Sequence, residues 1–162
     1  MNKKFNVRAL KQEDAKFLCS IFKDNEEYYK IFFDSESNLL NWEKRVERFI
    51  KQNDIRHYII ESNNISIGWL SFSDEKSTTR EVGIFVIDKE NLHIGYGTQG
   101  LSWLIDKCKK DGIQAITLSV NQDNTRAIRF YQKFGFRIFD EEIIPYCNEA
   151  TDVAQYKMKL VL

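Results

Sequence analysis

The chain has 162 residues, enough for one domain with a sizeable core and short for two. Lys plus Arg and Asp plus Glu both number 24, so the formal net charge is zero. This balance argues against a general attraction to nucleic acid or to an anionic membrane, although it leaves room for a local basic patch. Aromatic residues make up 14% of the chain, which suits a packed interior rather than disorder.

The cysteines and the N-terminal sequence favour a reducing compartment. Cys19, Cys108 and Cys147 have neither CxxC nor His spacing, so they indicate neither a disulfide framework nor a zinc site, and we expect no metal. The opening MNKKFNVRALKQED turns polar at once, and no apolar run reaches the length of a transmembrane helix. We therefore expect a cytoplasmic protein without a membrane or nucleic-acid partner.

Hydrophobic periodicity predicts a single domain over residues 1–162, with no repeat and no linker. A short strand at residues 5–10 precedes an amphipathic helix at residues 11–22, and a second amphipathic helix follows at residues 39–52. Two strands then meet at Ser62-Asn63-Asn64, which is a hairpin signal.

The second half of the chain alternates strands and helices. Residues 81–87, EVGIFVI, are nearly all apolar after the first and predict a central strand buried on both faces. A helix that ends before Gly112, a strand at residues 115–120, a helix at residues 124–136 and a C-terminal strand follow. This order predicts an α+β or mixed α/β domain around one sheet.

The segment NLHIGYGTQGLSWL, residues 91–104, places Gly95 and Gly97 between the central strand and a helix. The first N–H groups of a helix have no intrahelical partners and favour negative charge, and glycines let a ligand come close to them. The pattern predicts a phosphate cradle, although two glycines can also serve only a turn. Gly100 completes G-x-G-x-x-G, but we reject the dinucleotide-binding fingerprint because these glycines follow the strand too late and no acid follows the next strand.

A second motif makes the signal more specific. The segment NTRAIRFYQKFGFRI has the pattern N-x-x-A-x-x-x-Y-x-x-x-G-F, formed by Asn124, Ala127, Tyr131, Gly135 and Phe136. Together with the glycine loop, the central strand and the opening VRALKQEDA, it resembles the GNAT superfamily of acyl-CoA-dependent N-acetyltransferases. The resemblance runs from Val7 to about Ile138. It departs at Leu92, where the family usually has Gln or Arg three residues before the first loop glycine.

The resemblance implies a GNAT-like fold: a central, mostly antiparallel sheet of about six or seven strands, a splayed V between two parallel central strands, and about four flanking helices. It also implies that acetyl-CoA is the acetyl donor and that a primary amine attacks it directly in a ternary complex. The acceptor stays open among a small amine, an aminoglycoside, a polyamine and a protein N-terminus, and a homodimer also stays open. The alternative, which Leu92 favours, is a non-catalytic acyl-CoA-binding regulatory domain on the same scaffold.

By the same resemblance, the central strand, the glycine loop and the second motif would bind acetyl-CoA. The residues expected to contact it are Phe85, Val86, Ile87, His93, Ile94, Gly95, Tyr96, Gly97, Thr98, Asn124 and Ala127. Tyr131 would lie near the sulfur and donate a proton to the thiolate, although its position on an apolar helix face also fits a core residue.

The general base is harder to assign. Some family members have a catalytic Glu where this chain has Glu81, and an ordinary solvated carboxylate is the alternative. Others use a Glu on the following strand, where this chain has Ser119, which cannot serve. His57 is a weaker candidate, because a lone His in a strand is more often structural.

Recognition of the acceptor is expected from the acidic and aromatic segment at residues 24–37. Glu27 could attract a cationic amine while Tyr28 or Tyr29 packs on its methylene groups. The alternative is a solvated acidic face over a Phe-rich core.

Overall fold

The computed structural model describes residues 4–25, 39–73, 77–145 and 152–162. Within these ranges the chain forms four α-helices, two 3-10 turns and seven strands. In chain order they are β1 (Phe5–Ala9), η1 (Gln12–Asp14), α1 (Ala15–Asp24), α3 (Leu39–Lys51), β2 (Ile55–Ser62), β3 (Ile65–Ser73), β4 (Thr79–Ile87), η2 (Lys89–Asn91), α4 (Tyr96–Lys110), β5 (Ala115–Asn121), α5 (Thr125–Lys133), β6 (Arg137–Ile144) and β7 (Val153–Val161). No helix in the described ranges is both long and apolar enough to cross a membrane.

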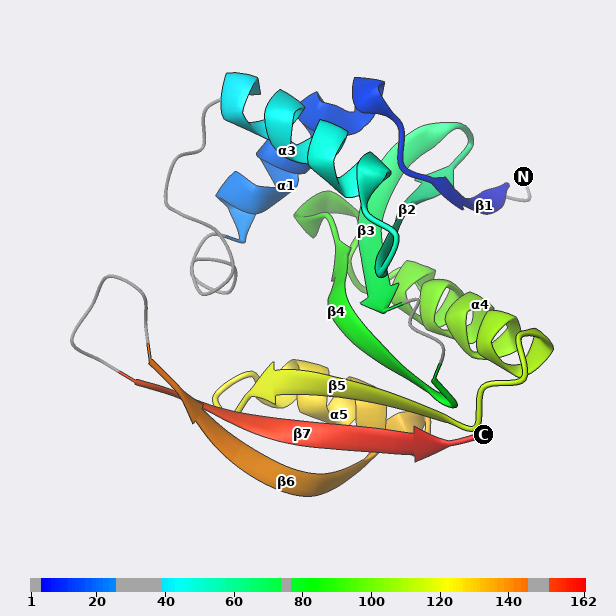
Figure 1. The fold of residues 1–162 in the computed structure, drawn as a ribbon, viewed down its shortest axis with the longest axis vertical. Helices are drawn as coiled ribbons and strands as arrows, with labels where there is room; N and C mark the ends of the chain where they lie inside the picture. The colour runs from blue at the N-terminus through cyan, green and yellow to red at the C-terminus, as the bar shows by residue number, and fades with distance from the viewer. Residues whose placement is uncertain (1–3, 26–38, 74–76, 146–151) are drawn as a thin grey trace.

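The seven strands form one sheet in the order β1-β2-β3-β4-β5-β7-β6. Neighbouring strands are antiparallel except β4 and β5, which are parallel. Figure 1 shows β4 and β5 close together near the C-terminus and diverging away from it. The expected α+β fold, with a mostly antiparallel sheet and one parallel central pair, is therefore confirmed.

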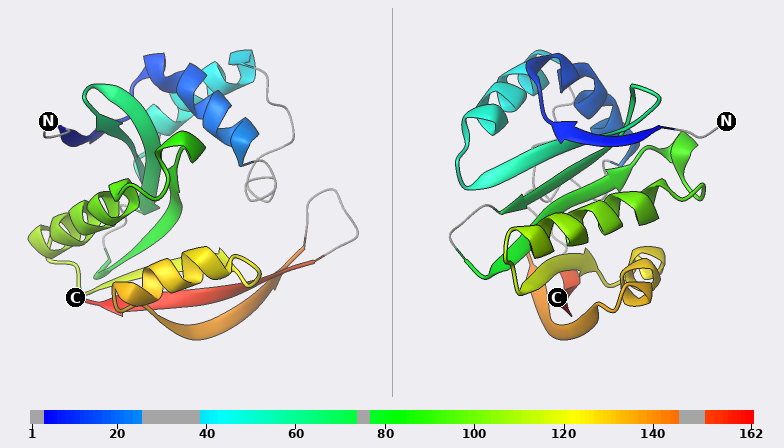
Figure 2. Two further views of the ribbon diagram at one scale, coloured as in Figure 1. Left: turned by 180° about the vertical axis from the view of Figure 1, so that it is seen from behind. Right: turned by 90° about the vertical axis from the view of Figure 1, so that its right-hand side faces the viewer.

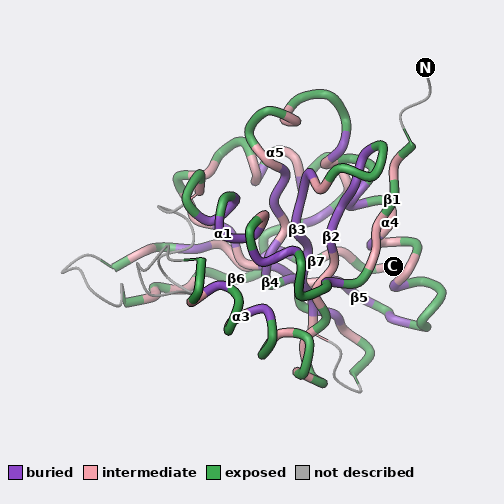
Figure 3. Tube along the Cα trace, turned by 90° about the horizontal axis from the view of Figure 1, so that it is seen from above, coloured by how far each residue is buried: buried purple, intermediate pink, exposed green. Residues whose placement is uncertain are grey.

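Helices cover both faces of the sheet, so the protein has two hydrophobic cores. Figure 2 shows α1 and α3 on one side of the first four strands and α4 on the other. Because side chains alternate along a strand, Ile59 belongs to the core under α1 and α3, whereas Ile60 belongs to the core under α4. Figure 3 shows the buried positions gathered along β2 and β3, with buried and exposed positions alternating along α3.

Most predicted elements are present, with boundaries shifted by a few residues. The hairpin is confirmed, and Asn63 and Asn64 have φ values of 52° and 64°, as a tight two-residue turn between twisted strands requires. The prediction that residues 81–87 are buried on both faces is wrong at Glu81 and Gly83, which are exposed. Glu81 lies on the face opposite the Val82 core, and Gly83 lies where β4 separates from β5.

Arg8 ties β1 to η1 and β2. Its guanidinium donates to the two carboxylate oxygens of Asp14 at 2.7 and 2.8 Å and to Glu61 at 2.6 Å. Both carboxylates are buried, so loss of Arg8 would leave uncompensated charge in the interior. Burial alone would raise the pKa of Glu61, but hydrogen bonds from Arg8 and Asn6 outweigh it and hold that pKa below its usual value.

Gly68 allows β3 to lie close to β4, and Gly68→Ala tests this contact. A Cβ at this position would lie 2.7 Å from the carbonyl oxygen of Val86 and 2.8 Å from Cδ1 of Ile87. The substitution should lower the free energy of unfolding, measured in urea, by about 1–3 kcal/mol because the strands must shift. Gly97→Ala is the control: its Cβ would lie 3.5 Å from Phe130, and alanine suits a helix. Equal stabilities of the two variants would contradict the prediction.

His57 is packed in the core under α3. Its ring stacks on Phe49 with a centroid distance of 4.2 Å, and its Nδ1 accepts a hydrogen bond from Trp69 Nε1 at 3.3 Å. Burial lowers the pKa of His57 to about 4. The folded protein therefore keeps this imidazole neutral, which fits a structural role.

Stability should consequently fall as the pH falls from 6.5, the ordinary histidine value, towards about 4. In this window the unfolded chain binds a proton at His57 that the folded chain excludes, so acid favours unfolding. His57→Gln removes this titration, so its melting temperature should depend less steeply on pH than that of the wild type. A wild-type slope in His57→Gln would refute the assignment.

Candidate active site

Strands β4 and β5 separate after a short stretch of pairing. The parallel ladder joins Thr79–Val82 to Ala115–Leu118 and ends there. Gly83 forms a bulge in β4, because the residues on either side of it pair with consecutive residues of β3. A bulge bends the strand that contains it. Beyond Gly83, β4 remains paired with β3 and has no ladder with β5, so the expected splayed V is present.

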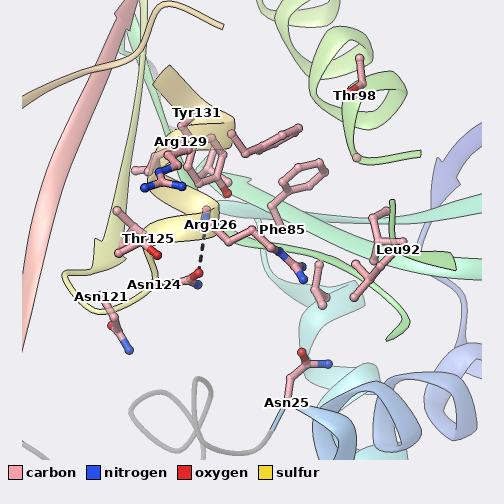
Figure 4. A pocket seen from close by; sticks show the side chains of 18 of the residues that line it. Asn25, Phe85, Leu92, Thr98, Asn121, Asn124, Thr125, Arg126, Arg129 and Tyr131 are labelled. Carbon is pink, nitrogen blue, oxygen red and sulfur yellow. Dashed lines mark hydrogen bonds between the residues drawn. The ribbon is translucent and has the colours of Figure 1, made fainter. Parts of the chain in front are cut away.

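The V is the inner part of a cleft of about 960 Å³. This volume is near the upper end of the range for small-molecule sites, about 300–1,000 Å³. One wall is the end of β4 with the loop before α4, and the other is the end of β5 with α5. The fold thus brings the glycine loop and the second motif to two sides of one site (Figure 4).

The loop before α4 is shaped by two residues with positive φ. His93 has a φ of 63° and Gly95 a φ of 95°. Such a conformation costs energy at a non-glycine residue and is typical of functional loops. A Cβ on Gly95 would meet nothing within 4 Å, so the backbone there is open to a ligand. The N–H groups of the first turn of α4 follow directly and need partners from outside the helix.

Most of the residues expected to bind acetyl-CoA line this cleft. They are Phe85, Val86, Ile87, His93, Gly95, Gly97, Thr98, Asn124 and Ala127. Ile94 and Tyr96 are not among the lining residues. The Ile94 side chain is exposed, and the Tyr96 side chain is buried with its hydroxyl 2.6 Å from Ser62 Oγ, so only the backbone of Tyr96 can face a ligand.

Asn124, the N-cap residue of α5, and Tyr131 within α5 both line the cleft. The Oδ1 atom of Asn124 accepts a hydrogen bond from Ala127 N at 3.2 Å, drawn as a dashed line in Figure 4, and so caps the helix. Its Nδ2 group remains the side-chain donor for a ligand. Tyr131 is buried between Phe130 and Phe136. Burial raises the pKa of Tyr131, so the phenol keeps its proton at neutral pH and can act as a proton donor.

Glu81 is not among the residues that line the cleft. It lies in the paired part of β4 opposite Thr117, before the V opens, and its backbone N–H donates to Ser73 Oγ at 3.0 Å. The side chain is exposed, so the burial that we expected to adapt it to base catalysis is missing. Its assignment as the general base stays a prediction.

Two other expectations concern the rim of the cleft. Leu92 lines the cleft and is partly buried against the core under α4, so an apolar contact stands where the family usually has Gln or Arg. The candidate acceptor contacts Glu27, Tyr28 and Tyr29 lie outside the described residues.

The sequence interpretation missed lining residues on α5 and β7. Arg126, Arg129 and Lys133 recur on one face of α5 and bring positive charge to the cleft. Their helical spacing could have revealed them once Asn124 was placed at the start of the helix. Gln155 of β7 also lines the cleft, and no local sequence pattern signals it.

The comparisons with known proteins agree with this geometry. Residues 18–136 match the model of the acetyltransferase (GNAT) family. The structure is similar to that of spermidine N-acetyltransferase from Vibrio cholerae in complex with CoA and spermine, with a TM-score of 0.82 and 17% identity over 97% of this chain and 95% of that chain. At this identity the likeness shows the fold.

Two curated relatives match shorter segments. Mycothiol acetyltransferase of Brachybacterium faecium is 23% identical over 77 residues, 46% of this chain and 23% of that protein. N-alpha-acetyltransferase 50 of Danio rerio is 46% identical over 48 residues, 29% of each chain. This chain therefore spans less than a third of the length of the curated relatives it matches. The family model, in contrast, includes both motifs and most of the chain, and the protein belongs to the acetyltransferase (GNAT) family.

Proposed function

We propose that the protein is an enzyme that transfers the acetyl group of acetyl-CoA to a primary amine while both substrates occupy the cleft. The observation that supports this best is the V between β4 and β5. The cleft at this V is lined by the cationic face of α5 and by Tyr131, which is buried and protonated. The amine then attacks the acetyl group directly, without a covalent acyl-enzyme.

The lining residues fit acetyl-CoA along its length. Backbone groups of residues 83–87 that have no partner on β5 can bind the amides of the pantetheine arm. The N–H groups at the start of α4 suit the pyrophosphate, because they favour negative charge. Arg126 and Arg129 can form charge-assisted hydrogen bonds with phosphate oxygens.

The relatives suggest acceptor classes to test. The Vibrio cholerae enzyme was crystallised with CoA and spermine, which makes a polyamine one class. The name of N-alpha-acetyltransferase 50 adds an α-amine as a second class. Acceptors of both classes carry a primary ammonium group. We therefore propose a primary amine as the acceptor, and the turnover assay below compares amines that differ in the rest of the molecule.

Acetyl transfer to an amine has three physical requirements: the ammonium must lose a proton, the thioester carbonyl must be polarised, and the departing thiolate benefits from a proton. Bound acetyl-CoA supplies the activated thioester. Backbone N–H groups of β4 beyond Gly83 can donate to its carbonyl oxygen. Tyr131 holds a proton that it can pass to the sulfur.

Acetyl-CoA should raise the melting temperature of the protein. A ligand at a hundred times its Kd adds about 2.7 kcal/mol of stability. The double variant Arg126→Ala/Arg129→Ala should weaken binding at least about tenfold, because it removes two charge-assisted contacts to phosphate. The matched control is Arg48→Ala on α3, away from the cleft, which should bind as the wild type does. The absence of any shift at millimolar acetyl-CoA would rule out the proposed donor.

Turnover is measured as thiol release with spermidine, n-butylamine, kanamycin or a peptide with a free N-terminal alanine. Tyr131→Phe should lower kcat about 100-fold, because a positioned general acid contributes at least this much. Stabilisation by acetyl-CoA should stay at the wild-type level. Tyr156→Phe is the control, because Tyr156 packs in the same core and does not line the cleft. If Tyr131→Phe keeps the wild-type kcat, Tyr131 has only a packing role. If acetyl-CoA stabilises the wild-type protein but no amine is acetylated, a binding domain is favoured.

A further inference from the structure

The cleft is lined from both faces of the sheet. Leu118 and Val120 of β5 belong to the core under α4 and α5, so Ser119 and Asn121, which alternate with them, lie on the opposite face. Both are half-buried and line the cleft. Tyr131 lines it from the α5 side (Figure 4). A second substrate can therefore approach the V from the face opposite α5.

Gln155 of β7 belongs to this second face, and its side-chain oxygen has no hydrogen-bond donor among the described residues. It pairs with Asn121 in the β5–β7 ladder, is 3% exposed and donates from Nε2 to Asn121 Oδ1 at 2.7 Å. Its Oε1 atom is buried and accepts no hydrogen bond within the part of the chain that is described, although the residue lines the cleft. Buried polar atoms are nearly always paired in a working protein, and an N–H donor that reaches Oε1 from the cleft would complete its hydrogen bonding.

A carboxylate lies behind Ser119. Ser119 Oγ donates to Oε1 of Glu142 on β6 at 3.1 Å, and Oε2 of Glu142 pairs with Lys157 Nζ of β7 at 2.8 Å. The hydrogen bond and charge of Glu142 raise the pKa of Lys157, and the charges of Asp140 on β6 and Glu81 on β4 add to this effect. Glu142 thus reaches from β6 across the intervening strand β7 to Ser119 on β5.

We propose that Gln155, Ser119 and Glu142 form the site, here called the amine patch, that binds the primary ammonium group of the acceptor and removes its proton. The inference rests on the proposed acetyl transfer. Gln155 Oε1 and Ser119 Oγ accept hydrogen bonds from the ammonium nitrogen. Ser119 passes its hydroxyl proton to Glu142 and receives one from the ammonium, so the nitrogen becomes nucleophilic where it meets the V.

The proton balance of the reaction agrees with these roles. An alkylammonium ion and acetyl-CoA give an N-alkylacetamide, the CoA thiol and one proton. The freed lone pair of the nitrogen forms the C–N bond, and the C–S bond breaks with its electron pair on sulfur. The first proton lost by nitrogen passes through Ser119 to Glu142, which releases it to solvent. Sulfur takes the proton of Tyr131, and the second proton lost by nitrogen restores Tyr131.

Gln155→Leu tests the binding role. It removes the acceptor oxygen at similar size, so KM for the amine should rise about 10- to 100-fold, the usual effect of losing a hydrogen bond to a charged group. The stabilisation by acetyl-CoA should not change, and kcat should stay near the wild-type value. Gln155→Glu retains an acceptor oxygen and should keep KM at or below the wild-type value. Gln122→Leu is the control, because Gln122 binds Glu141 at 3.3 Å and does not line the cleft.

Glu142→Gln tests the proton transfer. The amide can still accept the hydrogen bond of Ser119 but takes up no proton, so kcat should fall at neutral pH. It should recover as the pH rises towards the pKa of the amine, because a free amine needs no base. A merely structural defect would not produce this recovery. Glu141→Gln, the neighbouring exposed carboxylate, should keep the wild-type pH profile.

The assay uses spermidine, n-butylamine, kanamycin and the alanine peptide as amines. Wild-type turnover with at least one of them, together with the KM rise in Gln155→Leu and the pH-dependent loss in Glu142→Gln, supports the amine patch. Wild-type kinetics in both variants would overturn the amine patch and leave acetyl transfer standing. If the wild-type protein is stabilised by acetyl-CoA and acetylates none of the four, the amine patch and the proposed function both fail.

Discussion

The parallel ladder between β4 and β5 ends after four residue pairs, and the cleft depends on this early end. Backbone groups beyond Val82 lose their partners on β5, which would be costly in a closed core and is useful where a ligand with amide groups enters. The opening is rigid, because β3 holds β4 on one side and β7 holds β5 on the other. Because the cleft is already open, little binding free energy is lost in ordering it when a ligand binds.

A cleft that passes between two strands can take two substrates from opposite faces of the sheet. The α5 side provides the cations and the phenol of Tyr131, whereas the other side provides Ser119 and the side-chain oxygen of Gln155. In the proposed reaction this separation keeps the phosphates of the donor away from the carboxylates that would attract the amine. The reacting atoms then meet only within the V, which suits direct attack.

Local patterns predicted much of the fold and part of the site. The hairpin at Asn63-Asn64 and the helix cap at Asn124 depend on residues adjacent in the chain, so the sequence was sufficient there. The exposure of Glu81 was not predictable, because it depends on which part of each sheet face the helices cover. Glu142 and Gln155 reach Ser119 and Asn121 from 23 and 34 residues away through strand pairing, which no local pattern encodes.

The two interpretations of Tyr131, a core residue and a proton donor, are compatible. Its contacts with Phe130 and Phe136 remove water from the ring, and this burial raises the pKa of its hydroxyl. A phenol in water is already protonated at neutral pH, and burial adds further resistance to ionisation. The apolar packing that makes Tyr131 look structural therefore keeps the proton that a departing thiolate would take.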